Sequence, residues 1–146
     1  MSEKSFLDQA AEFTYQQLER VGGDPTKLDP PLQTIAILYT IQAMIDNGGF
    51  RYIFENNAPL QPPYSLYSEA YRRIGAFAAA DNLDKAVALF PFPDAHLHPR
   101  QRNDFMDSLD EEHELFLLGD TVCGDESVWT AMEAYARKHS ASFSVH

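Results

Sequence analysis

One stretch of this chain, residues 32–45, is apolar on almost every side of a helix. It follows Asp29-Pro30-Pro31 and runs into Asp46-Asn47-Gly48-Gly49. An acid followed by prolines is typical of a helix N-terminus, and glycines are typical of a helix C-terminus. A helix without a polar face has to be covered by other elements. The sequence therefore predicts a central buried helix, with the rest of the chain arranged around it.

The apolar residues elsewhere in the chain also repeat at helical spacing, and no segment alternates as a strand would. We expect helices over residues 6–21, 50–55, 66–78, a short stretch capped by Asn82, the acidic segment that follows residue 103, and a last stretch capped by Asp125. Prolines predict loops over residues 57–63 and 91–99. The predicted fold is all-α: a single compact domain of six to seven helices over residues 1–146, with a frayed tail over 140–146.

Acidic residues are concentrated in one part of the chain. Residues 103–136 hold ten carboxylates and no Lys or Arg, in a chain of formal net charge −11. Unrelieved like charges oppose folding and suggest a partner of opposite sign. The ten acids are Asp104, Asp107, Asp110, Glu111, Glu112, Glu114, Asp120, Asp125, Glu126 and Glu133. We take all of them except Glu133 as candidate partner-binding residues.

The acidic segment could fold as one bent helix or as two. On one helix over residues 104–118, five acids from Asp104 to Glu114 would form a stripe opposite an apolar arc. Successive acids would lie about one 5.4 Å turn apart, which loosely resembles the spacing of DNA phosphates. Ser108-Leu109-Asp110-Glu111 could instead be a capping box that restarts the helix. The simplest alternative is that these acids only form a solvated surface.

Composition excludes several classes of protein. The single cysteine, Cys123, rules out an intrachain disulfide framework, and a pI near 4.7 argues against direct binding to nucleic acid or to an anionic membrane. No apolar run reaches the roughly 18 residues of a transmembrane helix, and the N-terminus does not resemble a signal peptide. We therefore expect a cytoplasmic protein, monomer or homodimer, that contacts neither membrane nor nucleic acid directly.

Candidate catalytic groups are few. His96 and His98, with Asp94 nearby and His113 and Glu114 further on, could in principle bind a metal, but their spacing is not diagnostic. Acids at 120, 125 and 126 disfavour a thiolate at Cys123. We expect no catalytic residues, no metal and no cofactor.

The string from Asn47 to Asn56 is the most distinctive motif. A left-handed residue is needed where the buried helix ends, and glycine supplies it. Aromatic residues four apart then hold the next short helix to the core. The structural residues of this motif are Asn47, Gly48, Gly49, Phe50, Phe54 and Asn56.

This string, together with residues 70–76 (Ala-Tyr-Arg-Arg-Ile-Gly-Ala) and 109–112 (Leu-Asp-Glu-Glu), resembles a bacterial all-helical family. That family, long a domain of unknown function, is now named after a DNA-mimic protein. The similarity covers most of residues 30–120, with one departure: Tyr52-Ile53-Phe54 stands where the family often has Gln followed by two aromatic residues. The resemblance implies a helical acidic protein that presents carboxylates in place of DNA phosphates to a transcription factor.

Three functions remain open at this point. The first is a non-catalytic DNA mimic that occupies the DNA-binding surface of a basic DNA-binding protein and so regulates transcription. The second is an immunity or antitoxin-like inhibitor of a basic nuclease or toxin, which would use the same acidic face. The third is a metal-dependent enzyme that uses His96, His98 and nearby carboxylates.

Overall fold

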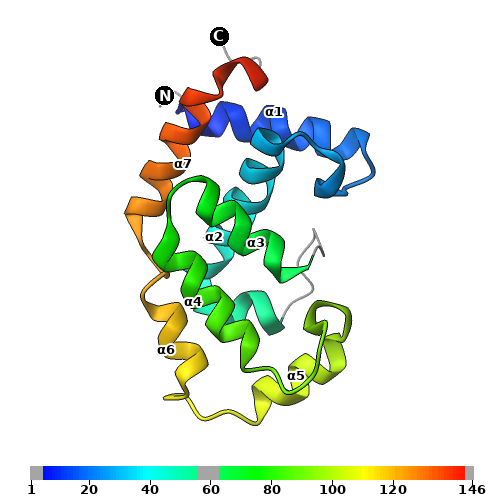
Figure 1. Ribbon diagram of the computed structural model, residues 1–146, viewed down its shortest axis with the longest axis vertical. Helices are drawn as coiled ribbons and strands as arrows, with labels where there is room; N and C mark the ends of the chain where they lie inside the picture. The colour runs from blue at the N-terminus through cyan, green and yellow to red at the C-terminus, as the bar shows by residue number, and fades with distance from the viewer. Residues whose placement is uncertain (1–4, 56–62, 144–146) are drawn as a thin grey trace.

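The computed structural model describes residues 5–55 and 63–143, and within these ranges every regular element is a helix (Figure 1). This confirms the all-α prediction. The α-helices are α1 (Phe6–Arg20), α2 (Pro30–Glu55), α3 (Tyr64–Arg73), α4 (Phe77–Ala88), α5 (Pro99–Asp107), α6 (Glu114–Asp120) and α7 (Glu126–Lys138); the 3₁₀ turns are η1 (Pro25–Lys27), η2 (Ala95–Leu97) and η3 (Ser140–Ser142).

Helix α2 is the centre of the molecule, as predicted. It packs against α1, α3, α5, α6 and α7, and Figure 1 shows it running behind α3 while α1 crosses its upper end. Its residues Ile35, Leu38 and Ile41 are completely buried. Burial of one such side chain contributes about 1.5–3 kcal/mol, so the apolar helix supplies much of the driving force for folding.

The glycine pair bends α2 near its end. Gly49 adopts φ 65°, in the left-handed region, and Phe50 and Phe54 beyond it are buried with their rings 5.9 Å apart. Asn47 Nδ2 donates to the Ala43 carbonyl at 2.9 Å. The predicted turn is confirmed for these residues, whereas Asn56 and most of the predicted loop over 57–63 lie outside the described residues.

A close approach explains why α6 can lie on this turn. A Cβ on Gly119 would come within 2.8 Å of Phe50 Cγ and 2.9 Å of the Phe50 backbone nitrogen. Real Cβ atoms do not make such contacts, so only glycine allows α6 to pack here. The Asn47–Phe54 motif is therefore both a turn and a docking site for the acidic half of the chain.

The predicted boundary between the helix over 66–78 and the helix capped by Asn82 is wrong, because α3 ends at Arg73 and α4 begins at Phe77. The break falls at Gly75, which has φ 83°, and the Ala76 N–H donates to the Tyr71 carbonyl at 2.9 Å. This arrangement is a Schellman-type helix end, which favours glycine over the alanines around it. Asn82 does not cap a helix but lies within α4, where its Nδ2 donates to Thr121 Oγ1 at 2.7 Å.

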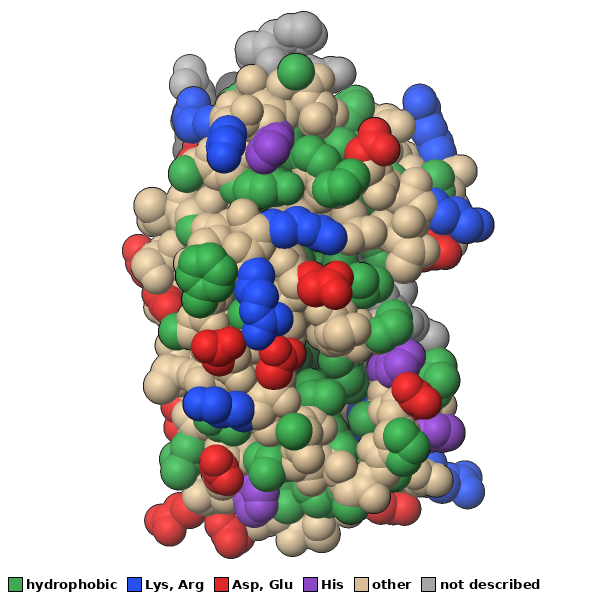
Figure 2. Space-filling model, in the orientation of Figure 1, with side chains coloured by type: hydrophobic (Ala, Val, Ile, Leu, Met, Phe, Trp, Pro, Cys, Tyr) green, Lys and Arg blue, Asp and Glu red, His purple; other side chains and the backbone are tan. Residues whose placement is uncertain are grey.

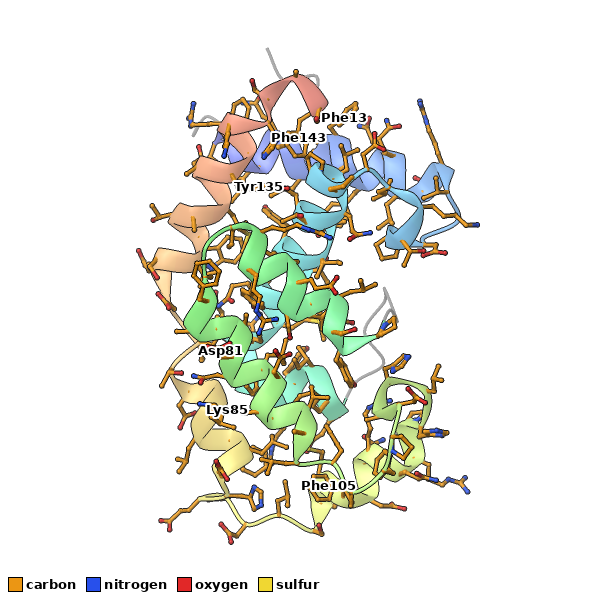
Figure 3. All side chains as sticks on the ribbon, viewed as in Figure 1. Phe13, Asp81, Lys85, Phe105, Tyr135 and Phe143 are labelled. Carbon is orange, nitrogen blue, oxygen red and sulfur yellow. The ribbon has the colours of Figure 1, made fainter. Side chains whose placement is uncertain are left out.

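The C-terminal segment is not frayed as far as residue 143. Phe143 is completely buried in the core cluster, and η3 leads into it (Figure 3). The prediction of a frayed tail is wrong for residues 140–143, because one large aromatic side chain gives the segment an anchor; residues 144–146 lie outside the described part. Among the described residues, no helix is long and apolar enough to span a membrane.

Candidate binding surface

The acidic segment folds as two helices with a turn between them. Helix α5 ends at Asp107 and α6 begins at Glu114, so the single stripe from Asp104 to Glu114 does not exist. The Ser108 hydroxyl donates to the Phe105 carbonyl at 2.6 Å, and Asp110 Oδ1 accepts from the Glu112 N–H at 2.9 Å. Such local side-chain bonds compete with the helix and end it.

The helix restart also differs from the prediction. The N-cap of α6 is His113, whose Nδ1 accepts from the Leu115 N–H at 3.1 Å, so Ser108 starts no capping box. Of the closely spaced acid pairs expected on one helix, only Asp104 and Asp107 still share one. Splitting the segment therefore relieves much of the repulsion that a single helix would have carried.

Eight acids of this segment form what we call the acidic band. All eight side chains are exposed, and no ion pair joins any of them to another described residue. The segment runs from α5 through α6 to the start of α7, along the lower end and one side of the molecule in Figure 1, and Figure 2 shows acidic side chains along those edges. The band comprises Asp104, Asp107, Asp110, Glu111, Glu112, Glu114, Asp120 and Glu126.

The other two acids of the segment have structural partners. Asp125 is half-buried and caps α7, where its Oδ1 accepts from the Ser127 N–H at 2.9 Å. Glu133 Oε2 accepts from the Leu7 N–H at 2.9 Å, and its Oε1 pairs with Arg137 at 3.0 Å. Asp125 was a candidate partner-binding residue; its carboxylate already has this capping role, so we leave it out of the band.

Buried apolar side chains and one buried arginine anchor the helices that carry the band to the core. Leu115 and Met106 are buried, and Arg102 is only 2% exposed. Arg102 Nε donates to the Phe54 carbonyl at 3.0 Å, and its NH1 donates to the Ala95 carbonyl at 2.7 Å. Sequence reasoning missed this arginine, although its position four residues before Met106 places both on the inner face of α5.

A second, partly buried network holds the turn between α6 and α7. Asp46 Oδ1 accepts from Gln42 Nε2 and from the Gly124 N–H, both at 2.8 Å, and Oδ2 accepts from Trp129 Nε1 at 2.8 Å. Gln42 is fully buried and also accepts from the Tyr71 hydroxyl at 2.7 Å. Burial, with a smaller effect of the Asp46 charge, raises the pKa of Tyr71 well above its usual value. The sequence indicated Asp46 only as the end of a helix.

One cation lies beside the band. Arg51 stacks over the Phe116 ring at 4.5 Å from its centroid and pairs with Glu55 at 3.5 Å. It shares a depression of about 240 Å³ with Glu111 and Asp120, and Gly48 and Gly49 also line it. The glycine motif and the acidic band, which the sequence presents as separate features, therefore meet at one place.

The two histidines considered as metal ligands, His96 and His98, have aromatic neighbours. The His96 ring lies 6.1 Å from the Tyr64 ring, and the His98 ring lies 6.2 Å from the Phe92 ring. In residues 5–55 and 63–143, no three His, Cys, Asp or Glu side chains come together in a way that could hold a metal ion. Cys123 is exposed, and its Sγ lies 3.6 Å from the Asp46 carbonyl oxygen. No described geometry favours catalysis at these residues.

Comparison with known proteins gives one result. The sequence profile of the DMP19-like proteins matches residues 26–139, which is most of the chain. Comparison with curated proteins and with solved structures found no significant match. The matched range includes the glycine motif, the α3–α4 turn and the entire acidic band, and on this ground the chain belongs to the DMP19-like family, named after DNA mimic protein 19.

Proposed function

We propose that this protein is a non-catalytic DNA mimic, whose acidic band occupies the DNA-binding surface of a basic protein such as a transcription factor. One observation carries the proposal: eight exposed carboxylates follow each other along one segment, and none of them makes an ion pair with a described cation. Alternating signs of charge are typical of a solvent-exposed helix, whereas a block of like charges often serves interaction with a partner. Membership of the DMP19-like family supports the same function.

The band follows a curved path, because α5, the turn after it, α6 and the first residue of α7 carry it. A groove-binding protein contacts phosphates on both sides of a groove, so a curved distribution of charge suits such a partner at least as well as a straight stripe. Glu114 and Glu126 each begin a helix, where the helix dipole favours an acid. The remaining six acids gain no such stabilisation and are the sharper candidates for partner contact.

The proposal is tested with four neutralising substitutions: Asp107→Asn, Asp110→Asn, Glu111→Gln and Glu114→Gln. Each keeps the size of the side chain and a hydrogen-bond acceptor, including that of Asp110 for Glu112. A matched control changes Asp29→Asn, Asp94→Asn, Glu19→Gln and Glu69→Gln, which are exposed acids outside the band. Both variants lose the same charge, so a general effect of net charge would affect them equally.

We expect the wild-type protein and the control to capture a DNA-binding protein from bacterial lysate, and duplex DNA to displace it. The band variant should lose capture by about 100-fold, and added salt should weaken capture steeply. Circular dichroism checks that both variants fold. If the band variant captures as well as the control, or if DNA does not compete, the mimicry proposal is wrong.

The same surface could inhibit a basic nuclease or toxin, and that is the second candidate function. Capture of a nuclease whose activity the protein inhibits, or rescue of cells that express a toxin, would favour this function over transcription regulation. Both functions place the protein in the bacterial cytoplasm, and fractionation of cells that produce it would test that location.

A further inference from the structure

A groove of about 600 Å³ lies between the second half of α7 and the turn that joins α3 to α4. Its lining includes Arg73, Ile74, Phe77, Ala134, Tyr135 and Lys138, and we call it the basic groove. In Figure 3 it lies in the upper half of the molecule, where Tyr135 is labelled, whereas the acidic band follows the lower end and the side.

The basic groove has the opposite charge from the rest of the protein. Although 22 of the 146 residues are acidic, none of its described lining residues is Asp or Glu. Lys138 makes no ion pair with any described residue. Figure 2 shows Lys, Arg and His side chains gathered around hydrophobic ones in this upper part of the face.

Arg73 is held in place by neutral groups. Its NH1 donates to Gln33 Oε1 at 3.0 Å and to Thr34 Oγ1 at 3.3 Å, and Thr34 is completely buried. The Tyr135 hydroxyl donates to the same Thr34 oxygen at 3.3 Å. Because these acceptors carry no charge, they orient the guanidinium without cancelling its positive charge.

Stabilisation of helix ends does not account for this arrangement. Basic residues in the last turns of α3 and α7 do complement the helix dipoles. At the end of α3, however, Arg72 pairs with Asp81 at 3.1 Å and with Asp84 at 2.6 Å, whereas the described partners of neighbouring Arg73 are all neutral. Helix dipoles also give no reason for the charged ends of two helices to line one groove.

The groove also has apolar surface. Phe77, the first residue of α4, is 61% exposed, and Ile74 and Ala134 lie in the same groove. The Tyr135 ring packs at a tilt of 48° against His139, with ring centroids 4.5 Å apart. A ligand that fits here must therefore pair with cations and cover an aromatic ring at the same time.

We propose that the basic groove binds a short acidic peptide segment of a partner protein, in which carboxylates flank an aromatic or aliphatic residue. A carboxylate pairs well with an oriented guanidinium, and the aromatic or aliphatic side chain between the carboxylates would cover Phe77. The net charge of −11 repels a long polyanion such as DNA, whereas a short acidic segment can lie within about one Debye length, roughly 8 Å, of the groove cations. The site is separate from the acidic band, so either proposal can fail without the other.

The test selects displayed random short peptides on the wild-type protein, with counter-selection on the double variant Arg73→Gln and Lys138→Gln. The double variant Arg100→Gln and Lys85→Gln is the control, because these exposed residues carry the same charges and do not line the groove. We expect acidic peptides with one aromatic or aliphatic residue to be enriched. The groove variant should bind the best peptide about tenfold more weakly, and the control variant should bind as the wild type does. Phe77→Ser should weaken binding while leaving the charges intact.

Amide chemical shifts then locate the bound peptide. We expect changes at the α3–α4 turn and the second half of α7. Enriched peptides without acidic residues, equal binding by the groove variant, or shifts elsewhere would each overturn the proposal. Two further results would overturn it, because the groove would then bind something other than an acidic peptide. One is a DNA duplex that binds the groove more tightly than the peptide does. The other is a protein dimer that dissociates when Lys138→Gln and Phe77→Ser are introduced.

Discussion

The acidic band and the basic groove carry opposite charges, and they also hold those charges differently. The band acids lie on short helices and turns, and their side chains are exposed and make no ion pair with a described cation. In the groove, Arg73 is oriented by a buried threonine and by Gln33. Flexible exposed charges give long-range attraction and fast association, whereas an oriented charge gives specificity. We therefore expect the band mainly to increase the rate of association with its partner, and the groove mainly to determine which ligand binds there.

The band, unlike the groove, depends on the turn that Asp46 holds, so the largest expected loss of stability comes from Asp46→Ala. The change leaves Gln42 Nε2, the Gly124 N–H and Trp129 Nε1 without their shared acceptor, so the free energy of unfolding should fall by about 3 kcal/mol. Urea unfolding followed by Trp129 fluorescence measures it. Asp46→Asn keeps one oxygen acceptor and should cost less; equal losses for both variants would contradict the assigned role of the carboxylate.

A smaller loss should follow from Gly119→Ala. The new Cβ would meet Phe50 Cγ at 2.8 Å, so α6 must move away from the glycine turn, at a cost of about 2 kcal/mol. Thermal unfolding measures the loss. Amide shifts should change along the band and not in the basic groove, and a shift pattern that included the groove would show that the two regions are coupled. Gly124→Ala is a useful contrast, because its cost would come from φ 73° rather than from a clash.

The central helix, the acidic segment and the C-terminal tail show where prediction from the sequence succeeded and where it failed. The central helix was predictable, because residues 32–45 are apolar all round and have clear signals at both ends. The division of the acidic segment into two helices was not predictable from the spacing of its apolar residues. Ser108 and Asp110 end the first helix through local hydrogen bonds, which that spacing does not reveal. Phe143 was missed for a similar reason: burial of one side chain outweighs a polar tail around it.

The candidate site was predictable in its composition and not in its shape. Eight of the nine proposed acids are exposed, as a binding surface requires, but Asp125 already caps α7. The basic groove could not be read from the sequence, since Arg73 and Lys138 are far apart in the chain and only the packing of α3 and α7 against α2 places them around one groove. Tertiary contacts of this kind leave no periodic signal.

High pH should destabilise the fold through two tyrosines, Tyr39 and Tyr64. Burial raises the pKa of Tyr64 from 10.0 to about 12, and burial with the Asp8 hydrogen bond does the same for Tyr39. The folded state therefore holds these phenol protons more tightly than the unfolded state, so the stabilisation is complete below pH 10 and falls as pH rises to about 12. Urea midpoints across this range should decline, and Tyr64→Phe should make the decline shallower. A flat profile would contradict the raised pKa values of Tyr39 and Tyr64.

The smallest effect is a difference in salt dependence. Each ion pair formed on binding adds to the slope of log affinity against log salt. The band has eight acids, and the groove has two cations, that make no ion pair with a described residue. Binding of a basic protein to the band should therefore weaken more steeply with salt than binding of an acidic peptide to the groove. Titrations at several salt concentrations give both slopes. Part of the peptide affinity comes from contact with Phe77, which salt does not screen, so a measurable fraction should persist at high salt. Equal slopes would mean that the groove, like the band, works by charge alone.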